Sequence, residues 1–157
     1  MTLDRFHQIG SLLQVEYEAK NWIEVEKLAK EYLDLAEEHR SDWNYGNAIH
    51  HANLVLGKIA LEHKDLEKAK DYFLKAGKSK GSPQLGSFGP NMSLARDLLE
   101  IGEQEVVLEY LDLVKRFWNP LFAFLKIRKW KAMIKKGQVP DFKGNNLYYL
   151  TDPKRSV

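Results

Sequence analysis

The first 82 residues of this 157-residue chain contain no proline, and their apolar side chains recur every three or four positions. The first stripe consists of Leu3, Phe6, Ile9 and Leu13, and the second of Trp22, Val25, Leu28, Ala29, Tyr32 and Ala36. Side chains at this spacing lie on one face of an α-helix, and the alternation typical of strands is almost absent here. The pattern therefore predicts an all-α protein.

About seven helices are expected along the chain. They cover residues 3–20, 22–39, 43–63, 66–76, 91–101, 103–117 and 121–136. The Gly77–Pro90 segment is rich in glycine and proline. It is expected to be an ordered or semi-ordered loop, because Leu85 and Phe88 are apolar enough to hold it in place. Residues 138–157 are expected to form an irregular tail.

Two parts of the sequence repeat each other at a fixed distance. At a constant offset of 38 residues, Leu56, Gly57, Ala60, Ala69, Phe73 and Ala76 match Leu94, Ala95, Leu98, Val107, Leu111 and Val114. A weaker match at an offset of 40 aligns Ala29, Leu33 and Ala36 with Ala69, Phe73 and Ala76. Helix pairs that repeat in this way indicate units that stack on one another.

The first matched set resembles the tetratricopeptide repeat. In that family a Leu-Gly pair lies on the first helix of each unit. A small residue, a large apolar residue and an alanine follow on the second helix. Leu56-Gly57 and the trio Ala69, Phe73 and Ala76 stand at that spacing, with Lys64-Asp65 at the turn. The period of 38 to 40 exceeds the family's roughly 34 residues, and the Gly77–Pro90 insertion accounts for the longer second link.

The resemblance implies antiparallel helix pairs stacked as a short right-handed solenoid. Residues 1–137 would form the helical domain, with a repeat core at about 3–117 and a basic capping helix at about 119–136. Residues 138–157 would follow as the C-terminal tail. A single unit of this kind cannot bury its apolar face, so about three units must stack.

The resemblance also implies a concave groove, lined by the first helix of each unit, that holds a peptide or protein partner. The expected groove residues are Asn47, His51, Leu54, Lys58, Met92 and Arg96. Lys58 and Arg96 are equivalent at the offset of 38, and two such cations can hold a carboxylate or phosphate by charge-assisted hydrogen bonds. The alternative is that both are ordinary surface cations.

Charge is divided unevenly along the chain. Residues 1–113 carry 13 basic and 20 acidic side chains, whereas residues 114–157 carry 11 basic side chains and only two acids. The candidate basic surface consists of Lys126, Arg128, Lys129, Lys131, Lys135 and Lys136, interleaved with aromatic residues. Such a segment can bind nucleic acid or lie on an anionic membrane. The alternative is a capping helix whose aromatic side chains close the end of the core.

No catalytic residue, metal ligand set or cofactor site is predicted. The chain has no cysteine, which excludes thiolate metal sites and thiol nucleophiles. It has no phosphate-binding loop, zinc helix or nucleophile elbow. His50 and His51 are adjacent on a helix and point about 100° apart, so they cannot easily chelate one ion. No apolar run reaches the roughly 18 residues that a membrane span requires, and a cytoplasmic protein is expected.

These observations favour a non-enzymatic protein-binding adaptor. One specific form is an inhibitory or immunity-type partner of another protein. The alternative function is association with nucleic acid through the basic aromatic C-terminal helix. The partner and the oligomeric state do not follow from the sequence.

Overall fold

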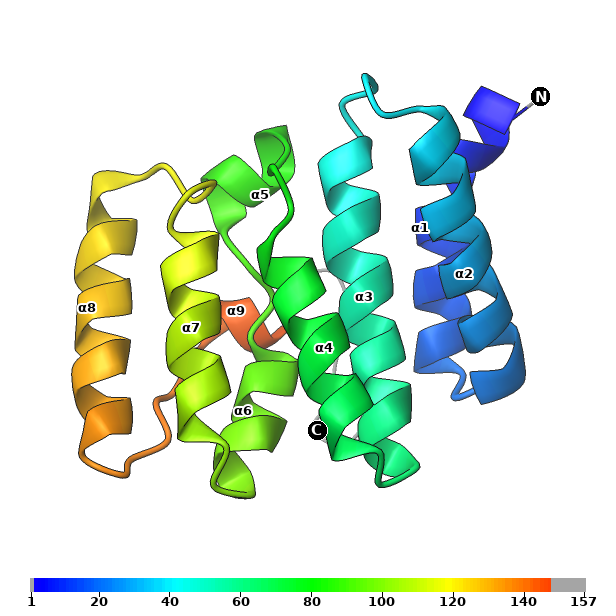
Figure 1. Cartoon of the computed structure of the whole chain (residues 1–157). Helices are drawn as coiled ribbons and strands as arrows, with labels where there is room; N and C mark the ends of the chain where they lie inside the picture. Colours follow the sequence, from blue (N-terminus) through cyan, green and yellow to red (C-terminus); the bar gives the residue numbers. More distant parts are fainter. Residues whose placement is uncertain (1, 148–157) are drawn as a thin grey trace.

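A computed structural model describes residues 2–147, and within them every regular element is a helix (Figure 1). The helices are α1 (Thr2–Glu18), α2 (Trp22–Glu38), α3 (Tyr45–Glu62), α4 (Leu66–Gly77), α5 (Pro83–Phe88), α6 (Ser93–Glu100), α7 (Gln104–Val114), α8 (Leu121–Lys135) and α9 (Gly144–Leu147). The long helices pack antiparallel in sequence order, with α1 and α2 at one end of the molecule and α8 at the other (Figure 1). The all-α prediction is confirmed.

All seven predicted helices are present, with ends that differ by a few residues from those expected. Two short helices were not predicted. Helix α5 lies inside the expected Gly77–Pro90 loop, where the Ser82 hydroxyl accepts a hydrogen bond from the Leu85 N–H at 3.0 Å and Pro83 occupies the first turn. This N-cap and proline pair is a helix-start signal that the surrounding glycines obscured. Helix α9 lies in the expected tail, of which residues 148–157 are outside the described part.

Tight turns reverse the chain between paired helices. Lys64 adopts a left-handed backbone conformation with φ of 60°, and Asp65 caps α4 by accepting a hydrogen bond from the Lys68 N–H. Gly57 lies at a close approach of α3 to its neighbouring helices. A Cβ at Gly57 would meet Leu94 Cδ2 at 2.6 Å and the Ala69 carbonyl oxygen at 3.3 Å. Gly57 therefore lets α3 approach α4 and α6 closely, as the Leu-Gly pair led us to expect.

The apolar core has two parts. One is formed by α1, α2 and α3 and includes Phe6, Ile9, Leu13, Val25, Leu28, Ala52 and Val55. The other extends from α3 to α8 and includes Phe73, Leu94, Leu98, Tyr110, Leu111, Trp118, Trp130 and Ile134. Phe142, which follows α8, belongs to the second part and packs edge-on against Trp130 at 5.0 Å.

Helix α8 covers the end of the second core with a narrow stripe made of Ala123, Ile127, Trp130 and Ile134. The expected closure of the core by aromatic side chains holds for Phe117, Trp118 and Trp130, which are at most 5% exposed. It is wrong for Phe122 and Phe124, which are 53% and 61% exposed. A helix packed against one neighbour buries only one side, and these two residues are on the other side.

The segment between α4 and α5 lies directly on the start of α3. A Cβ at Gly46 would come within 1.8 Å of the Gly81 carbonyl oxygen, a backbone atom that no side-chain rotation can move away. The Ser79 hydroxyl donates to the Gly46 carbonyl at 2.7 Å and reinforces this contact. The position therefore admits only glycine.

We predict that Gly46→Ala lowers the free energy of unfolding by about 2–3 kcal/mol, because the overpacking cost exceeds the gain in helix propensity of up to about 1 kcal/mol. Urea unfolding followed by circular dichroism measures the difference. Gly144→Ala is the matched control, since no atom lies within 4 Å of its Cβ position. A Gly46→Ala protein as stable as the wild type would show that α3 and the α4–α5 segment are not in contact.

Candidate functional site

Five of the six expected groove residues are buried. Asn47, His51, Leu54, Met92 and Arg96 are at most 8% exposed. Lys58 is partly exposed, and its Nζ lies 3.1 Å from Asp97 Oδ2 in an ion pair. The two equivalent cations therefore differ in surroundings, one paired with a carboxylate at the surface and the other inside the protein. Their role as partner contacts stays a prediction, and a partner would reach the five buried residues only after the covering groups moved.

Part of the cover comes from the C-terminal segment of the same chain. The Asn145 carbonyl accepts a hydrogen bond from the Met92 N–H at 2.8 Å. Its side-chain amide donates to the carbonyl oxygens of Phe88 and Pro90 at 3.2 and 3.0 Å. Helix α9 thus lies against the start of α6, on one of the helices that the repeat pattern assigned to the groove.

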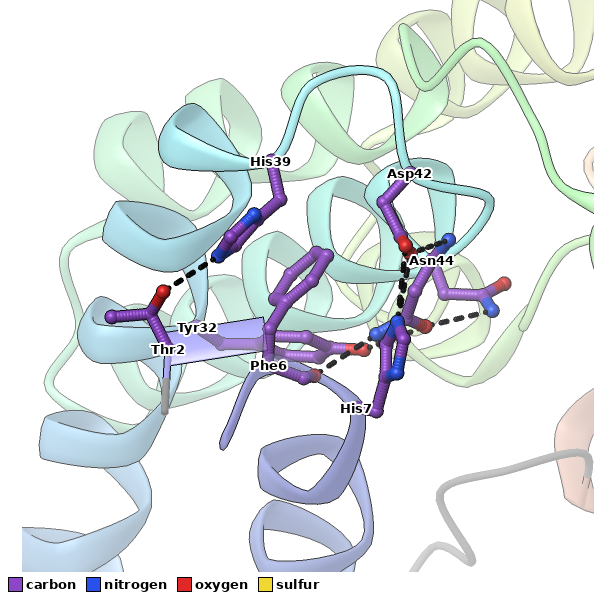
Figure 2. A network of polar contacts seen from close by, with 8 residues as sticks. Thr2, Phe6, His7, Tyr32, His39, Asp42 and Asn44 are labelled. Atoms are coloured by element: carbon purple, nitrogen blue, oxygen red, sulfur yellow. Dashed lines mark hydrogen bonds and ion pairs between the residues drawn. The ribbon is translucent and has the colours of Figure 1, made fainter. Parts of the chain in front are cut away.

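A buried polar network joins α1, α2 and α3, and Asn44 is its centre (Figure 2). The Asn44 amide nitrogen donates to the Phe6 carbonyl at 3.1 Å. Its amide oxygen accepts from the Tyr32 hydroxyl at 3.3 Å and from the Asn47 side chain at 3.1 Å. Burial raises the pKa of Tyr32 to about 12, so its hydroxyl keeps the proton that it donates.

The network continues from Asn47 into the Gly77–Pro90 segment. The Ser82 hydroxyl donates to the Asn47 amide oxygen at 2.6 Å, and the Asn47 amide nitrogen donates to Gln84 at 3.3 Å. One helical turn further along α3, His50 contacts the Ala76 carbonyl through Nδ1 at 3.1 Å and accepts from the Asn91 N–H through Nε2 at 3.2 Å. Asn47 therefore holds the middle of this segment on α3, and His50 holds the residues that flank its two ends.

The polar residues around Asn44 include a histidine–carboxylate pair. His7 Nε2 lies 3.1 Å from both oxygens of Asp42, and the His39 ring contacts the Thr2 hydroxyl (Figure 2). Burial raises the pKa of Asp42, but hydrogen bonds from the Asn44 N–H and His7 outweigh it and leave the pKa below its ordinary value. Within the described residues, no group of three or more His, Asp or Glu is arranged to hold a metal ion. The pair fixes the α2–α3 connection on α1.

The six predicted basic residues are all on α8 or directly after it and are at least partly exposed, and their role as one binding surface stays a prediction. Lys126, Arg128, Lys129, Lys135 and Lys136 are exposed, and Lys131 is partly exposed. Lys131 lies 2.7 Å from Asp112 and is the only one of the six that forms an ion pair within residues 2–147. Lys126 lies over the rings of Trp118 and Phe122 at 5.8 and 5.4 Å. Helix α8 itself contains no acidic residue, so this surface is strongly cationic.

Helix α8 also exposes four large apolar residues. Phe122 and Phe124 belong to the basic aromatic segment expected from the sequence, whereas Leu121 and Leu125 were missed. Leu121 is 85% exposed, Phe124 61%, Leu125 59% and Phe122 53%. These four residues form the first turn and a half of α8, and the cations follow directly. The signal was available, because the stripe of Ala123, Ile127, Trp130 and Ile134 recurs at helical spacing and leaves the other apolar positions outside.

A cleft of about 620 Å³ lies between α7 and α8. Its walls include Trp118, Leu121, Phe124 and Ile127 on the apolar side and Lys115, Arg128, Lys131 and Lys135 on the cationic side. A cleft with apolar walls and a cationic rim suits an apolar side chain flanked by carboxylates. We refer to the exposed residues of α8 together with this cleft as the α8 surface.

Comparisons with protein-family models, with curated proteins and with solved structures found no significant match to this chain. The resemblance to the tetratricopeptide repeat therefore stays a prediction. Among residues 2–147, no helix is both long and apolar enough to cross a membrane.

The buried His50 makes the stability of the fold depend on pH. Burial lowers the pKa of His50 from 6.5 to about 4, although its hydrogen bond to Ala76 opposes the shift. Below pH 6.5 the unfolded chain takes up a proton that the folded protein does not accept until about pH 4. The free energy of unfolding therefore falls as the pH drops through this window. Burial also lowers the pKa of His51 well below 6.5, with the same sign.

We predict that the wild type loses about 2 kcal/mol of stability through His50 between pH 7 and pH 5, in addition to the loss through His51. Urea unfolding at the two pH values measures the loss. In His50→Gln the free energy of unfolding should fall between pH 7 and pH 5 by about 2 kcal/mol less than in the wild type. This difference does not depend on how stable the variant is at pH 7. His63→Gln, at an exposed helix end, is the control and should keep the wild-type loss. An equal loss in His50→Gln and the wild type would contradict the assignment.

Proposed function

We propose that this protein is a non-enzymatic protein-binding adaptor of the tetratricopeptide type, and that its partner docks on the α8 surface. One observation carries the proposal. Four large apolar side chains that are 53% to 85% exposed stand beside six cations, of which only Lys131 has an ion-pair partner in the described part of the chain. Contiguous exposed apolar patches bordered by polar residues are typical of interaction sites.

The apolar part of the surface favours a protein partner over a nucleic acid. Bases stack on aromatic rings and phosphates pair with cations, but an aliphatic side chain contributes to neither. Leu121 is the most exposed residue of the patch, and Leu125 is 59% exposed. Burying aliphatic surface contributes about 25 cal/mol per Å², and a protein segment with apolar and acidic side chains buries it while pairing with the cations.

This proposal places the binding surface elsewhere than in the expected concave groove, whose residues are largely buried. An inhibitory or immunity-type role fits the same surface, because a basic and apolar helix can cover an acidic site on another protein. The nucleic-acid alternative rests on the cations and on the exposed rings of Phe122 and Phe124, and leaves Leu121 and Leu125 without a role. It differs in a measurable way, since phosphate contacts weaken steeply with salt whereas apolar contacts do not.

The experiment is affinity capture from host lysate at about 100 and about 500 mM NaCl, with the retained molecules identified by mass spectrometry. The test variant is Phe122→Ser/Phe124→Ser. The matched control is Trp43→Ser/Ile101→Ser, whose two residues are 51% and 55% exposed and lie outside the α8 surface. We expect a discrete protein that the wild type and the control retain at high salt and that the test variant loses.

Two results would contradict the proposal. Equal retention by the test variant would place the binding site elsewhere. The second result is that the wild type retains nucleic acid alone and loses it at about 500 mM salt. If Lys126→Glu/Arg128→Glu also loses it but Phe122→Ser/Phe124→Ser does not, the surface binds nucleic acid.

A further inference from the structure

The two ends of the helix row have opposite charge and similar apolar exposure. Residues 2–38, which contain α1 and α2, carry nine acidic and four basic side chains. Helix α8 carries five basic side chains and no acid. The end formed by α1 and α2 exposes Leu12, Val15, Trp22 and Ile23, with exposures from 41% to 87%. Each end therefore exposes apolar side chains, and the charges of the two ends are opposite.

Both terminal helices have one side that no other described helix covers extensively. Helix α1 packs chiefly on α2, and α8 packs chiefly on α7. On α1 the buried side is formed by Phe6, Ile9, Leu13 and Tyr17. The opposite side carries Asp4, Val15 and Glu18, all exposed. This side therefore carries an apolar residue and acidic residues, the two kinds of group that pair with the α8 surface.

We propose that the α8 surface of one molecule binds the α1–α2 end of a second copy, so that the protein associates end to end. The proposal rests on the proposed function in that it takes α8 as a docking surface, and it adds a second copy of the chain as an occupant of that surface. Val15 of one copy would meet the apolar start of α8 in the next, and Asp4 and Glu18 would meet its cations. Opposite charges placed across an interface in this way raise the association rate and exclude like-charged partners.

The contact cannot form within one molecule. Helix α1 and helix α8 lie at opposite ends of the row (Figure 1). A contact between two different surfaces is heterologous, and each added copy leaves one surface of each kind available. Association therefore continues beyond the dimer unless the assembly closes into a ring.

A second copy accounts for more of the structure than the other candidate occupants. An anionic membrane or a nucleic acid would satisfy the cations of α8 but would leave the acidic end without a partner. Neither would cover Val15 or Ile23, which are 61% and 87% exposed. A second copy covers both apolar ends and pairs the two charges. A helix about 22 Å long forms the contact, so the interface is small and the association weak.

Sedimentation velocity over a range of protein concentrations tests the proposal, with two variants that each disable one end. Val15→Lys/Glu18→Lys disables the α1 side, and Phe124→Glu/Arg128→Glu disables the α8 surface. All four residues are exposed, so both variants should keep the wild-type circular dichroism. We expect the wild type to associate with rising concentration. Each variant alone should remain a monomer, with a dissociation constant raised by about tenfold or more.

The mixture of the two variants is the decisive sample. Each retains the end that the other lacks, so an equimolar mixture should form a one-to-one dimer that does not grow further. Raising the salt from about 50 to about 500 mM should weaken this dimer. A mixture that stays monomeric, or a single variant that still dimerises alone, would overturn end-to-end association.

The failure of this inference is distinguishable from failure of the proposed function. A monomeric wild type whose α8 variant still loses a captured host protein would leave the adaptor proposal standing and overturn self-association. The wild type could instead be monomeric and sediment with vesicles containing about 30% phosphatidylserine, or bind a labelled oligonucleotide. Either result would assign the α8 surface to that anionic partner and overturn self-association.

Discussion

The buried hydrogen bonds at the start of α3 hold the rest of the structure in place. Asn44 uses its side-chain amide to join α1, α2 and α3, and Asn47 extends the chain of hydrogen bonds to Ser82. Each of these groups would be costly to leave unsatisfied inside the protein. Because all of them are satisfied only in one arrangement, the network determines where the α1–α2 pair and the Gly77–Pro90 segment sit relative to α3.

This arrangement also decides which surfaces remain for binding. With the Gly77–Pro90 segment on α3 and Asn145 bonded to the backbone at Met92, the residues assigned to a groove are covered. Within residues 2–147, only the adjacent helix packs extensively on α1 or on α8. The outer side of α8 therefore remains as an apolar and cationic surface, and the α1–α2 end is its acidic counterpart.

Much of the fold could be predicted, because helix formation depends on local spacing. The stripe in α1, the turn at Lys64 and the close approach at Gly57 all follow from residues within one helix pair. The candidate site could be predicted only in part. The cations of α8 were identified, but Leu121 and Leu125 were not, because the apolar run 121–125 shows its outer side only when it is compared with the stripe that continues through Ile127, Trp130 and Ile134. Asn47 and Arg96 were expected to line a groove, but both are buried. The repeat register predicts the direction of a side chain but not which other residues cover it.

The sequence by itself determined the helices, their order and the separation of charge between the two ends, because these depend on residue spacing and composition. Only the tertiary structure decided that Phe122 and Phe124 face outward while Trp118 and Trp130 are buried. It also decided that His51 and Met92 are enclosed. The physical reason is that burial depends on contacts between residues far apart in the chain, such as Asn145 with Met92, and no local pattern records those contacts.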